Sequence, residues 1–203
     1  TISIAPIEEQ LLKIENSKWQ KFKVKCNGLD HENIYKLLDS KKEIALDSNG
    51  SFTDEDCVFL QNNEATKSFL YLEQPRPIGE FSILNKSKFA NWMADEDCQD
   101  ISYLEKLQPH YSVINIKLMK CGGITAALEL IYEARKYNYK IMIGCMTESS
   151  VGISAGIAIA SLCDYADLDG ANLISNDFAQ GSFVENGKLV LSENPGLGIE
   201  MIS

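Results

Sequence analysis

The sequence predicts an α/β fold in which eight parallel strands alternate with helices and close into a barrel. Short apolar runs rich in β-forming residues recur along the chain, and amphipathic stretches separate them. Five of these runs end in charged residues, and the intervals between Lys25, Asp47, Glu73, Asp95 and Lys117 are 22, 26, 22 and 22 residues. Each interval fits one strand, one helix and two short loops. Eight strands in succession, without a GxGxxG motif after the first, favour a barrel over an open dinucleotide-binding sheet.

The elements follow in a regular order. The predicted strands end near residues 4, 25, 46, 73, 94, 117, 144 and 169. Clear helical stretches are 6–19, 125–138 and 150–165. In the second of these, Ala127, Leu130, Ile131 and Ala134 recur at i, i+3, i+4 and i+7, which gives one apolar helical stripe.

The alternation of strands and helices ends after residue 171. We therefore divide the chain into a barrel, 1–171, and a C-terminal segment, 172–203. The segment contains FVENGKLVL, in which Asn186 and Gly187 are typical of a two-residue hairpin turn. A tail rich in proline and glycine follows. We expect this segment to pack back on the barrel or on a capping region.

Composition narrows the class of protein. The chain has 203 residues, 45% of them hydrophobic, and a formal net charge of −10, which disfavours nucleic acid or an anionic membrane as a partner. Six scattered cysteines without a CxxC pair predict reduced thiols in a cytoplasmic protein. His31 and His110 lie in polar, loop-like settings and are read as surface residues.

Three acidic residues, Asp47, Glu73 and Asp95, each close an apolar run. At the carboxyl ends of neighbouring parallel strands, their side chains would meet at one end of the barrel. Three carboxylates without histidine or cysteine select a hard cation, and sparse protein ligation favours Mg²⁺ over Ca²⁺. The alternative is that each acid caps the helix that follows it.

Three lysines accompany the acids. Lys23 and Lys25 lie two apart on the KFKVK strand and therefore share its inner face, whereas Phe22 and Val24 point toward the helices. The like charge of Lys23 and a nearby cation would favour the neutral form of Lys25, which could then act as a base. Lys117 ends VINIK, a strand expected nearly across the barrel, and could present a second amine to the opposite face of a substrate. The alternative for any one lysine is an exposed strand end.

This constellation predicts metal-assisted proton transfer by an isomerase. The cation neutralises a substrate carboxylate, one lysine removes the α-proton, and the other returns a proton to the opposite face of the resulting enediolate. The centre is thereby inverted.

Together these residues resemble the enolase superfamily, specifically its muconate-cycloisomerase-like branch. The resemblance runs through KVK at 23–25, DSN at 47–49, EQP at 73–75, ADE at 94–96, NIKLMKCGG at 115–123, GCMTESSVG at 144–152, DLDGA at 167–171 and NPGLGIE at 194–200. It implies a (β/α)7β TIM-like barrel, Mg²⁺ on the three acids and acid/base roles for Lys25 and Lys117, with Lys23 assisting. The family's N-terminal α+β capping domain has no counterpart in these 203 residues. Homo-oligomers are expected from the helices exposed around such a barrel.

The DLDG motif indicates the substrate class. In dipeptide epimerases a similar Asp-Xaa-Asp binds the α-ammonium group of the substrate, so the resemblance assigns that role to Asp167 and Asp169. Two carboxylates on one strand face suit an ammonium group, although a polar turn is the alternative reading. The same motifs place Thr147 at the substrate, and Asn49, Glu96 and Glu148 as supports for the ligands. The predicted reaction is inversion of the C-terminal α-carbon of an L,L-dipeptide, for example one of the Ala-Glu type.

Other readings stay open. A cycloisomerase, an o-succinylbenzoate synthase or an N-acylamino acid racemase would use the same barrel on a substrate without a free ammonium group. A catalytically silent barrel fragment that serves as a binding subunit is the reading outside enzymology. The chain also departs from the family pattern, because DSNGSF follows the first acid and Asp97 takes a place where a hydroxyl is usual.

Overall fold

The computed structural model describes residues 1–202 as an α/β protein whose seven principal strands are hydrogen-bonded in chain order. The strands are β1 (Lys21–Lys25), β2 (Glu43–Asp47), β3 (Leu72–Glu73), β4 (Trp92–Ala94), β5 (Val113–Lys117), β6 (Lys140–Gly144) and β7 (Tyr165–Asp167). The strand predicted near residue 4 is only an isolated parallel bridge between Ile2 and Val24. The chain bends at Ile4 and enters a helix at Ile7, so this segment is too short to add a full strand.

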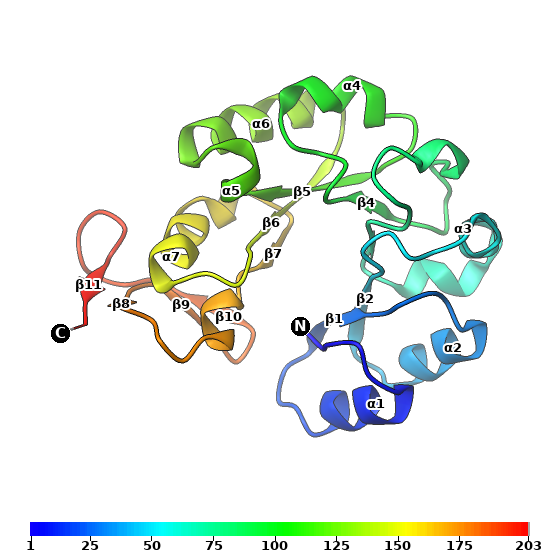
Figure 1. The fold of residues 1–203 in the computed structure, drawn as a ribbon, viewed down its shortest axis with the longest axis horizontal. Coiled ribbons are helices and arrows are strands. Elements are labelled where there is room, and N and C mark those ends of the chain that lie inside the picture. The colour runs from blue at the N-terminus through cyan, green and yellow to red at the C-terminus, as the bar shows by residue number, and fades with distance from the viewer. Residues whose placement is uncertain (203) are drawn as a thin grey trace. The chain divides into compact units, whose positions relative to one another are not determined.

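The chain divides into two compact units. Unit 1 comprises residues 1–97 and 105–113. Besides β1–β4 it contains α1 (Ile7–Glu15), α2 (His31–Asp39), α3 (Asp54–Asn62), η1 (Glu64–Ser68) and η2 (Phe81–Ile83). The pairs β1/β2, β2/β3 and β3/β4 are parallel, and α1 and α2 lie beside each other against β1 and β2 (Figure 1). The short α4 (Leu104–Leu107) lies where the chain passes between the units.

Unit 2 comprises residues 98–104 and 114–203, of which residue 203 lies outside the described part. Its elements besides β5–β7 are η3 (Ile101–Tyr103), α5 (Leu118–Cys121), α6 (Ile124–Lys136), α7 (Ser150–Ile159), η4 (Ala160–Leu162), η5 (Gly170–Leu173), β8 (Ala179–Gln180), β9 (Phe183–Glu185), β10 (Lys188–Val190) and β11 (Glu200–Met201). The hairpin predicted in the C-terminal segment is confirmed. β9 and β10 pair antiparallel through Asn186 and Gly187, whose φ angles of 50° and 74° fit a two-residue hairpin turn.

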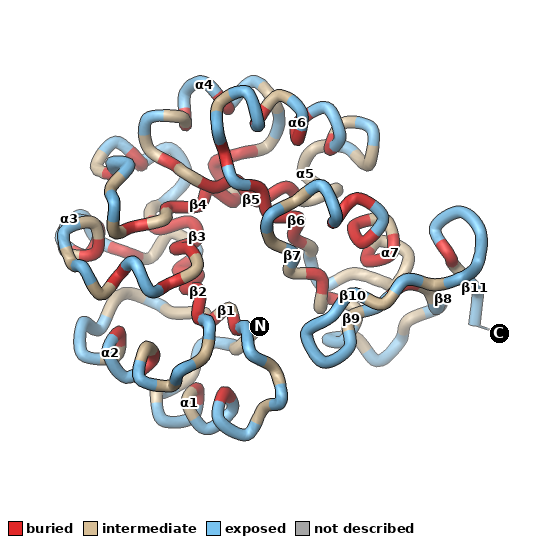
Figure 2. Tube along the Cα trace, turned by 180° about the vertical axis from the view of Figure 1, so that it is seen from behind, coloured by how far each residue is buried: buried red, intermediate tan, exposed pale blue. Residues whose placement is uncertain are grey.

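Burial follows the predicted patterns within each unit. The strands of the main sheet are largely buried and the outer faces of the helices are exposed (Figure 2). The stripe Ala127, Leu130, Ile131 and Ala134 forms the buried face of α6, as its spacing predicts. Within residues 1–202 none of the six cysteines forms a disulfide, and Cys57 and Cys98 are the buried ones. No helix among residues 1–202 has the length and apolar character needed to cross a membrane.

Candidate metal and proton-transfer site

The strand register of unit 1 brings three of the predicted site residues into one row. Lys25 pairs with Asp47 across β1 and β2, and Asp47 pairs with Glu73 across β2 and β3. The even spacing in the sequence therefore corresponds to adjacent positions at the carboxyl ends of three parallel strands. The row ends on β4 at Met93, and Asp95 lies two residues further along the chain, directly after the end of β4 at Ala94.

The β1 lysines point to the face that their alternation predicts. Phe22 and Val24 are buried, while Lys23 and Lys25 face the acids of the neighbouring strands. Lys23 Nζ lies 3.5 Å from Glu73 Oε2 and 3.9 Å from Asp47 Oδ2. Its side chain is only 11% exposed, so the ammonium group depends on these carboxylates for its stability away from water.

Lys25 is more open to solvent and has two partners. Its ammonium group lies 3.1 Å from Asp47 Oδ2 and donates a 2.8 Å hydrogen bond to Asn49 Oδ1. Asn49 also donates through Nδ2 to Glu96 Oε1 at 3.3 Å, and its backbone N–H donates to Asp47 Oδ1 at 3.1 Å. Asn49 and Glu96, which the resemblance implied as supports, are thus joined to Lys25 in one polar chain.

The helix-capping alternative for the acids does not hold. The N-cap of α3 is Thr53, which forms a capping box with Asp56, so Asp47 has no part in it. The 3-10 helix after β3 starts from Glu80, and the one after β4 starts from Asp100. Asp47, Glu73 and Asp95 are each 1% exposed, which is rare for carboxylates that have no specific task.

The three carboxylates do not form a finished metal site. Among residues 1–202, no three His, Cys, Asp or Glu side chains lie close enough together to hold a metal ion. The donor chemistry nevertheless fits a hard cation, because all three groups are carboxylates and Asp47 and Glu73 already share one ammonium group. Three carboxylates with two ammonium groups give the set a net charge of −1, which a cation would offset.

Unit 2 carries the remaining predicted residues. Lys117 ends β5 and is half-buried, and Asp167 ends β7. The pKa of the Cys145 thiol is affected by nearby acids. Burial raises the pKa of Cys145 to about 12, and the negative charges of Asp167, Asp169 and Glu148 add to this effect. Asp167, Asp169 and Glu148 therefore lie near enough to Cys145, the residue after β6, to act on it electrostatically.

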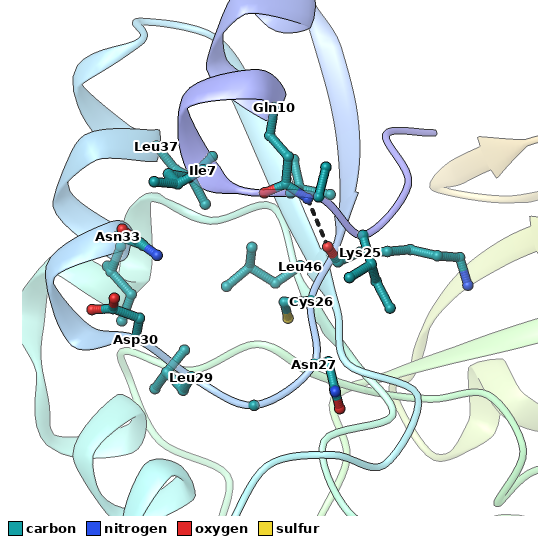
Figure 3. Close-up of a pocket in the computed structure, with 15 residues that line it drawn as sticks. Ile7, Gln10, Lys25, Cys26, Asn27, Leu29, Asp30, Asn33, Leu37 and Leu46 are labelled. Atoms are coloured by element: carbon teal, nitrogen blue, oxygen red, sulfur yellow. Dashed lines mark hydrogen bonds between the residues drawn. The ribbon is translucent and has the colours of Figure 1, made fainter.

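Thr147 is exposed in the loop after β6. In unit 1, a cavity of about 190 Å³ lies behind β1, lined by α1, α2 and the loop after the strand (Figure 3). Gln10 donates to the Lys25 carbonyl at 2.9 Å in this cavity, whereas the Lys25 side chain points away from it. The Gln10 side chain therefore holds the backbone of Lys25, and the Lys25 amine lies outside the cavity.

Sequence reasoning missed a buried polar group beside the acids. Gln74, Asp97 and Tyr111 are at most 3% exposed, and Asp97 forms hydrogen bonds with both of the others. Gln74 lies within the EQP motif, and Asp97 is one of the noted departures from the family. Two members of the group therefore lie in or beside motifs that the sequence shows. No spacing rule connects Tyr111 to Asp97, because their contact spans 14 residues and depends on packing.

Comparison with known proteins agrees with the fold and the motifs. The family model described as enolase C-terminal domain-like matches residues 7–202, and the chain belongs to that family. Among its relatives are dipeptide epimerases. An L-Ala-D/L-amino acid epimerase from Maribacter sp. (strain HTCC2170) is 34% identical over 99% of this chain and 61% of that protein.

Solved structures give the same result. A dipeptide epimerase from Methylococcus capsulatus complexed with Mg ion superposes with a TM-score of 0.89, at 29% identity over 99% of this chain and 64% of the other. The same enzyme complexed with Mg and the dipeptide L-Arg-D-Lys gives 0.87, at 30% identity over 98% and 62%. The predicted barrel class is confirmed, and the chain spans about three fifths of the length of these relatives.

Proposed function

We propose that the protein to which this chain belongs is a Mg²⁺-dependent dipeptide epimerase. The observation that carries the proposal is the register row of Lys25, Asp47 and Glu73, with the amines of Lys23 and Lys25 in contact with the acids. Buried carboxylates in contact with an interior lysine are costly to maintain and are typical of catalytic sites. The relatives named above support the same reaction class.

Asp47, Glu73 and Asp95 would hold the ion. Bound there, Mg²⁺ would neutralise the carboxylate of the substrate and make its α-proton more acidic. Lys25 is the base for one face of the α-carbon, and its contact with Asn49 fixes the direction of the amine. Lys23 compensates the charges of Asp47 and Glu73 and lies beside Lys25 on the same strand face.

The second half of the reaction is assigned to unit 2. Lys117, at the end of β5, exchanges a proton with the opposite face. Asp167 and Asp169 hold the ammonium group of an L,L-dipeptide, assisted by Glu148. The assignment of Lys117 rests on the family resemblance and on its place at a strand end. Inversion at the C-terminal residue then needs one proton removed and one delivered.

Deuterium exchange tests this proposal. The full-length protein with Mg²⁺ and a library of L,L-dipeptides in D₂O should incorporate deuterium at the C-terminal α-position and form the L,D product. Separate Lys25→Ala and Lys117→Ala variants should each lose epimerisation, while each still exchanges the α-proton of one epimer. Exchange into N-acylated amino acids but into no dipeptide would instead identify a racemase of the same branch. No exchange into any substrate would reject an active enzyme.

A further inference from the structure

The end of β3 changes direction at Gln74, directly after the second acid. Gln74 N donates to Met93 O at 2.9 Å, one residue beyond the last residue of the strand. Gln74 then adopts a φ of +36°, in the left-handed region that non-glycine residues rarely enter. The chain leaves the sheet there, and Asp95, two residues after Met93 and directly after β4, has no ladder partner on β3.

The Gln74 side chain takes over where the backbone pairing stops. Its Oε1 accepts hydrogen bonds from the backbone N–H groups of Asp95 at 3.1 Å and Asp97 at 3.2 Å. Its Nε2 donates to Arg76 O at 2.9 Å and to Asp97 Oδ2 at 3.0 Å. All four bonding positions of the amide are therefore used, and the residue is 2% exposed.

Gln74 also contacts the loop that follows Asp47. Gln74 O accepts from Gly50 N at 2.7 Å and from Ser48 Oγ at 2.8 Å. Ser48 directly follows Asp47. Gln74 thus contacts the backbone that follows Asp47, adjoins Glu73 in the chain and holds the N–H of Asp95.

Asp97 decides which way the amide faces. Its Oδ1 accepts from Gly79 N at 2.7 Å, and its Oδ2 accepts from Tyr111 Oη at 2.7 Å as well as from Gln74. Burial and the Asp97 charge raise the pKa of Tyr111, so its hydroxyl remains a donor. A carboxylate at 97 can only accept, which forces Gln74 to present Nε2 to it and Oε1 to the Asp95 backbone.

We propose that Gln74 is a positioning residue that sets the spacing of the Asp47, Glu73 and Asp95 carboxylates, with its orientation fixed by Asp97 and Tyr111. The third acid lies outside the sheet register, and this amide replaces the missing ladder bonds. The inference rests on the proposed function for the identity of the bound cation. The bonds themselves do not depend on it.

A donor–acceptor swap tests the proposal. Gln74→Glu keeps the shape and the acceptor for Asp95, but places an acceptor against the Asp97 carboxylate. Asp97→Asn removes the carboxylate that orients Gln74. In the double variant, the new amide at position 97 can donate to the new carboxylate at position 74, so this one contact is restored. The bonds of the parent protein to Arg76 O and from the Tyr111 hydroxyl are not restored, so the compensation is partial. Gln74→Met, which removes all four side-chain bonds, checks the conclusion without adding charge.

The first readout is Mn²⁺ binding to the full-length protein, measured by electron paramagnetic resonance. Each single variant should weaken binding by about tenfold or more, as expected when groups that orient metal ligands are lost, and the double variant should bind more tightly than Gln74→Glu alone. Gln61→Glu is the matched control, because Gln61 bonds to Ile83 O and Asn85 N, away from the acids. Binding unchanged in both single variants and in Gln74→Met would overturn the inference.

The second readout needs no metal. Crystal structures of the single variants should show the Asp95 backbone displaced from the end of β3, and the displacement should be smaller in the double variant than in Gln74→Glu. If the parent protein binds no Mn²⁺, the proposed function fails, yet these structures still decide the role of Gln74. An Asp95 backbone that stays in place in Gln74→Met refutes the positioning role whatever the metal result.

Discussion

The strand ends of unit 1 and unit 2 carry acids in different surroundings. In unit 1, Asp47, Glu73 and Asp95 are almost wholly buried, and lysine ammonium groups contact Asp47 and Glu73. In unit 2, Asp167 and Asp169 are half-buried, and their charges help to raise the pKa of the Cys145 thiol. Buried, paired charges are already oriented in the folded protein, so little reorganisation of the site is needed during the reaction. Half-exposed carboxylates suit capture of a substrate cation, because the ligand itself completes their desolvation.

The largest effect is expected from the buried set. Glu73→Gln removes a proposed metal ligand and, with it, a carboxylate that contacts Lys23. Since a metal ion contributes several kcal/mol to stabilising such a reaction, kcat/KM for Mg²⁺-dependent exchange should fall about a thousandfold or more. Treatment with EDTA should have the same effect on the parent protein and should be reversed by Mg²⁺.

The control for this variant is Glu105→Gln, an exposed acid on α4. It should leave both exchange and the melting temperature close to those of the parent protein. Equal losses in Glu73→Gln and Glu105→Gln would mean that net charge, not the buried site, governs activity.

Substitution of the acids in unit 2 should change substrate binding more than the chemical step. Asp169→Asn removes one of the charges proposed to hold the substrate ammonium group, so KM for dipeptides should rise about tenfold to a hundredfold, with a smaller change in kcat. An N-acetylated dipeptide, which lacks that ammonium group, should be nearly insensitive to the change. A fall in kcat alone would contradict the division of tasks between the two sets of acids.

Removal of the hydrogen-bond partner of Lys25 should have a moderate effect on the rate of proton transfer. Asn49→Gly removes the partner that accepts from Lys25 Nζ at 2.8 Å, and glycine tolerates the φ of 43° at this position. We expect kcat to fall about tenfold with little change in KM, because a misdirected amine transfers protons less well once the substrate is bound. Asn138→Gly is the control, since Asn138 also has a positive φ, of 60°, in the loop after α6. A matching loss there would indicate a backbone effect.

Much of the site was predictable because a parallel sheet converts even spacing into adjacency. The intervals from Lys25 to Asp47 and from Asp47 to Glu73 became direct register partners. Alternation in KFKVK correctly divided its lysines from Phe22 and Val24. These features depend only on local periodicity and on the order of elements.

Other features depend on packing that spacing does not encode. Asp95 follows Glu73 by the same interval that separates Lys25 and Asp47, yet it lies two residues beyond the register row. The left-handed conformation of Gln74 ends β3 early, and the contact of Tyr111 with Asp97 closes the network. The predicted first strand was reduced to a bridge because the turn into α1 comes within a few residues. Side-chain networks and early strand ends arise from tertiary contacts.

The smallest effect concerns the C-terminal segment of unit 2. Asp177 Oδ2 accepts from the Ser150 hydroxyl at 2.7 Å and from its backbone N–H at 2.8 Å, at the start of α7. The Ser150 hydroxyl bond lowers the pKa of Asp177 below its ordinary value, with help from backbone N–H groups. A lowered pKa in the folded state means that this contact stabilises the fold above the ordinary carboxyl pKa and is lost as the pH falls through the lowered value.

Asp177→Asn should therefore lower Tm at pH 7 by about one or two degrees. The difference from the parent protein should shrink below pH 3.8 in calorimetric scans, because the parent carboxylate then loses its charge as well. Glu193→Gln, an exposed acid of the same segment, should show no such pH-dependent difference. If the deficit of Asp177→Asn persisted unchanged in acid, the contact would act through packing and not through the carboxylate charge.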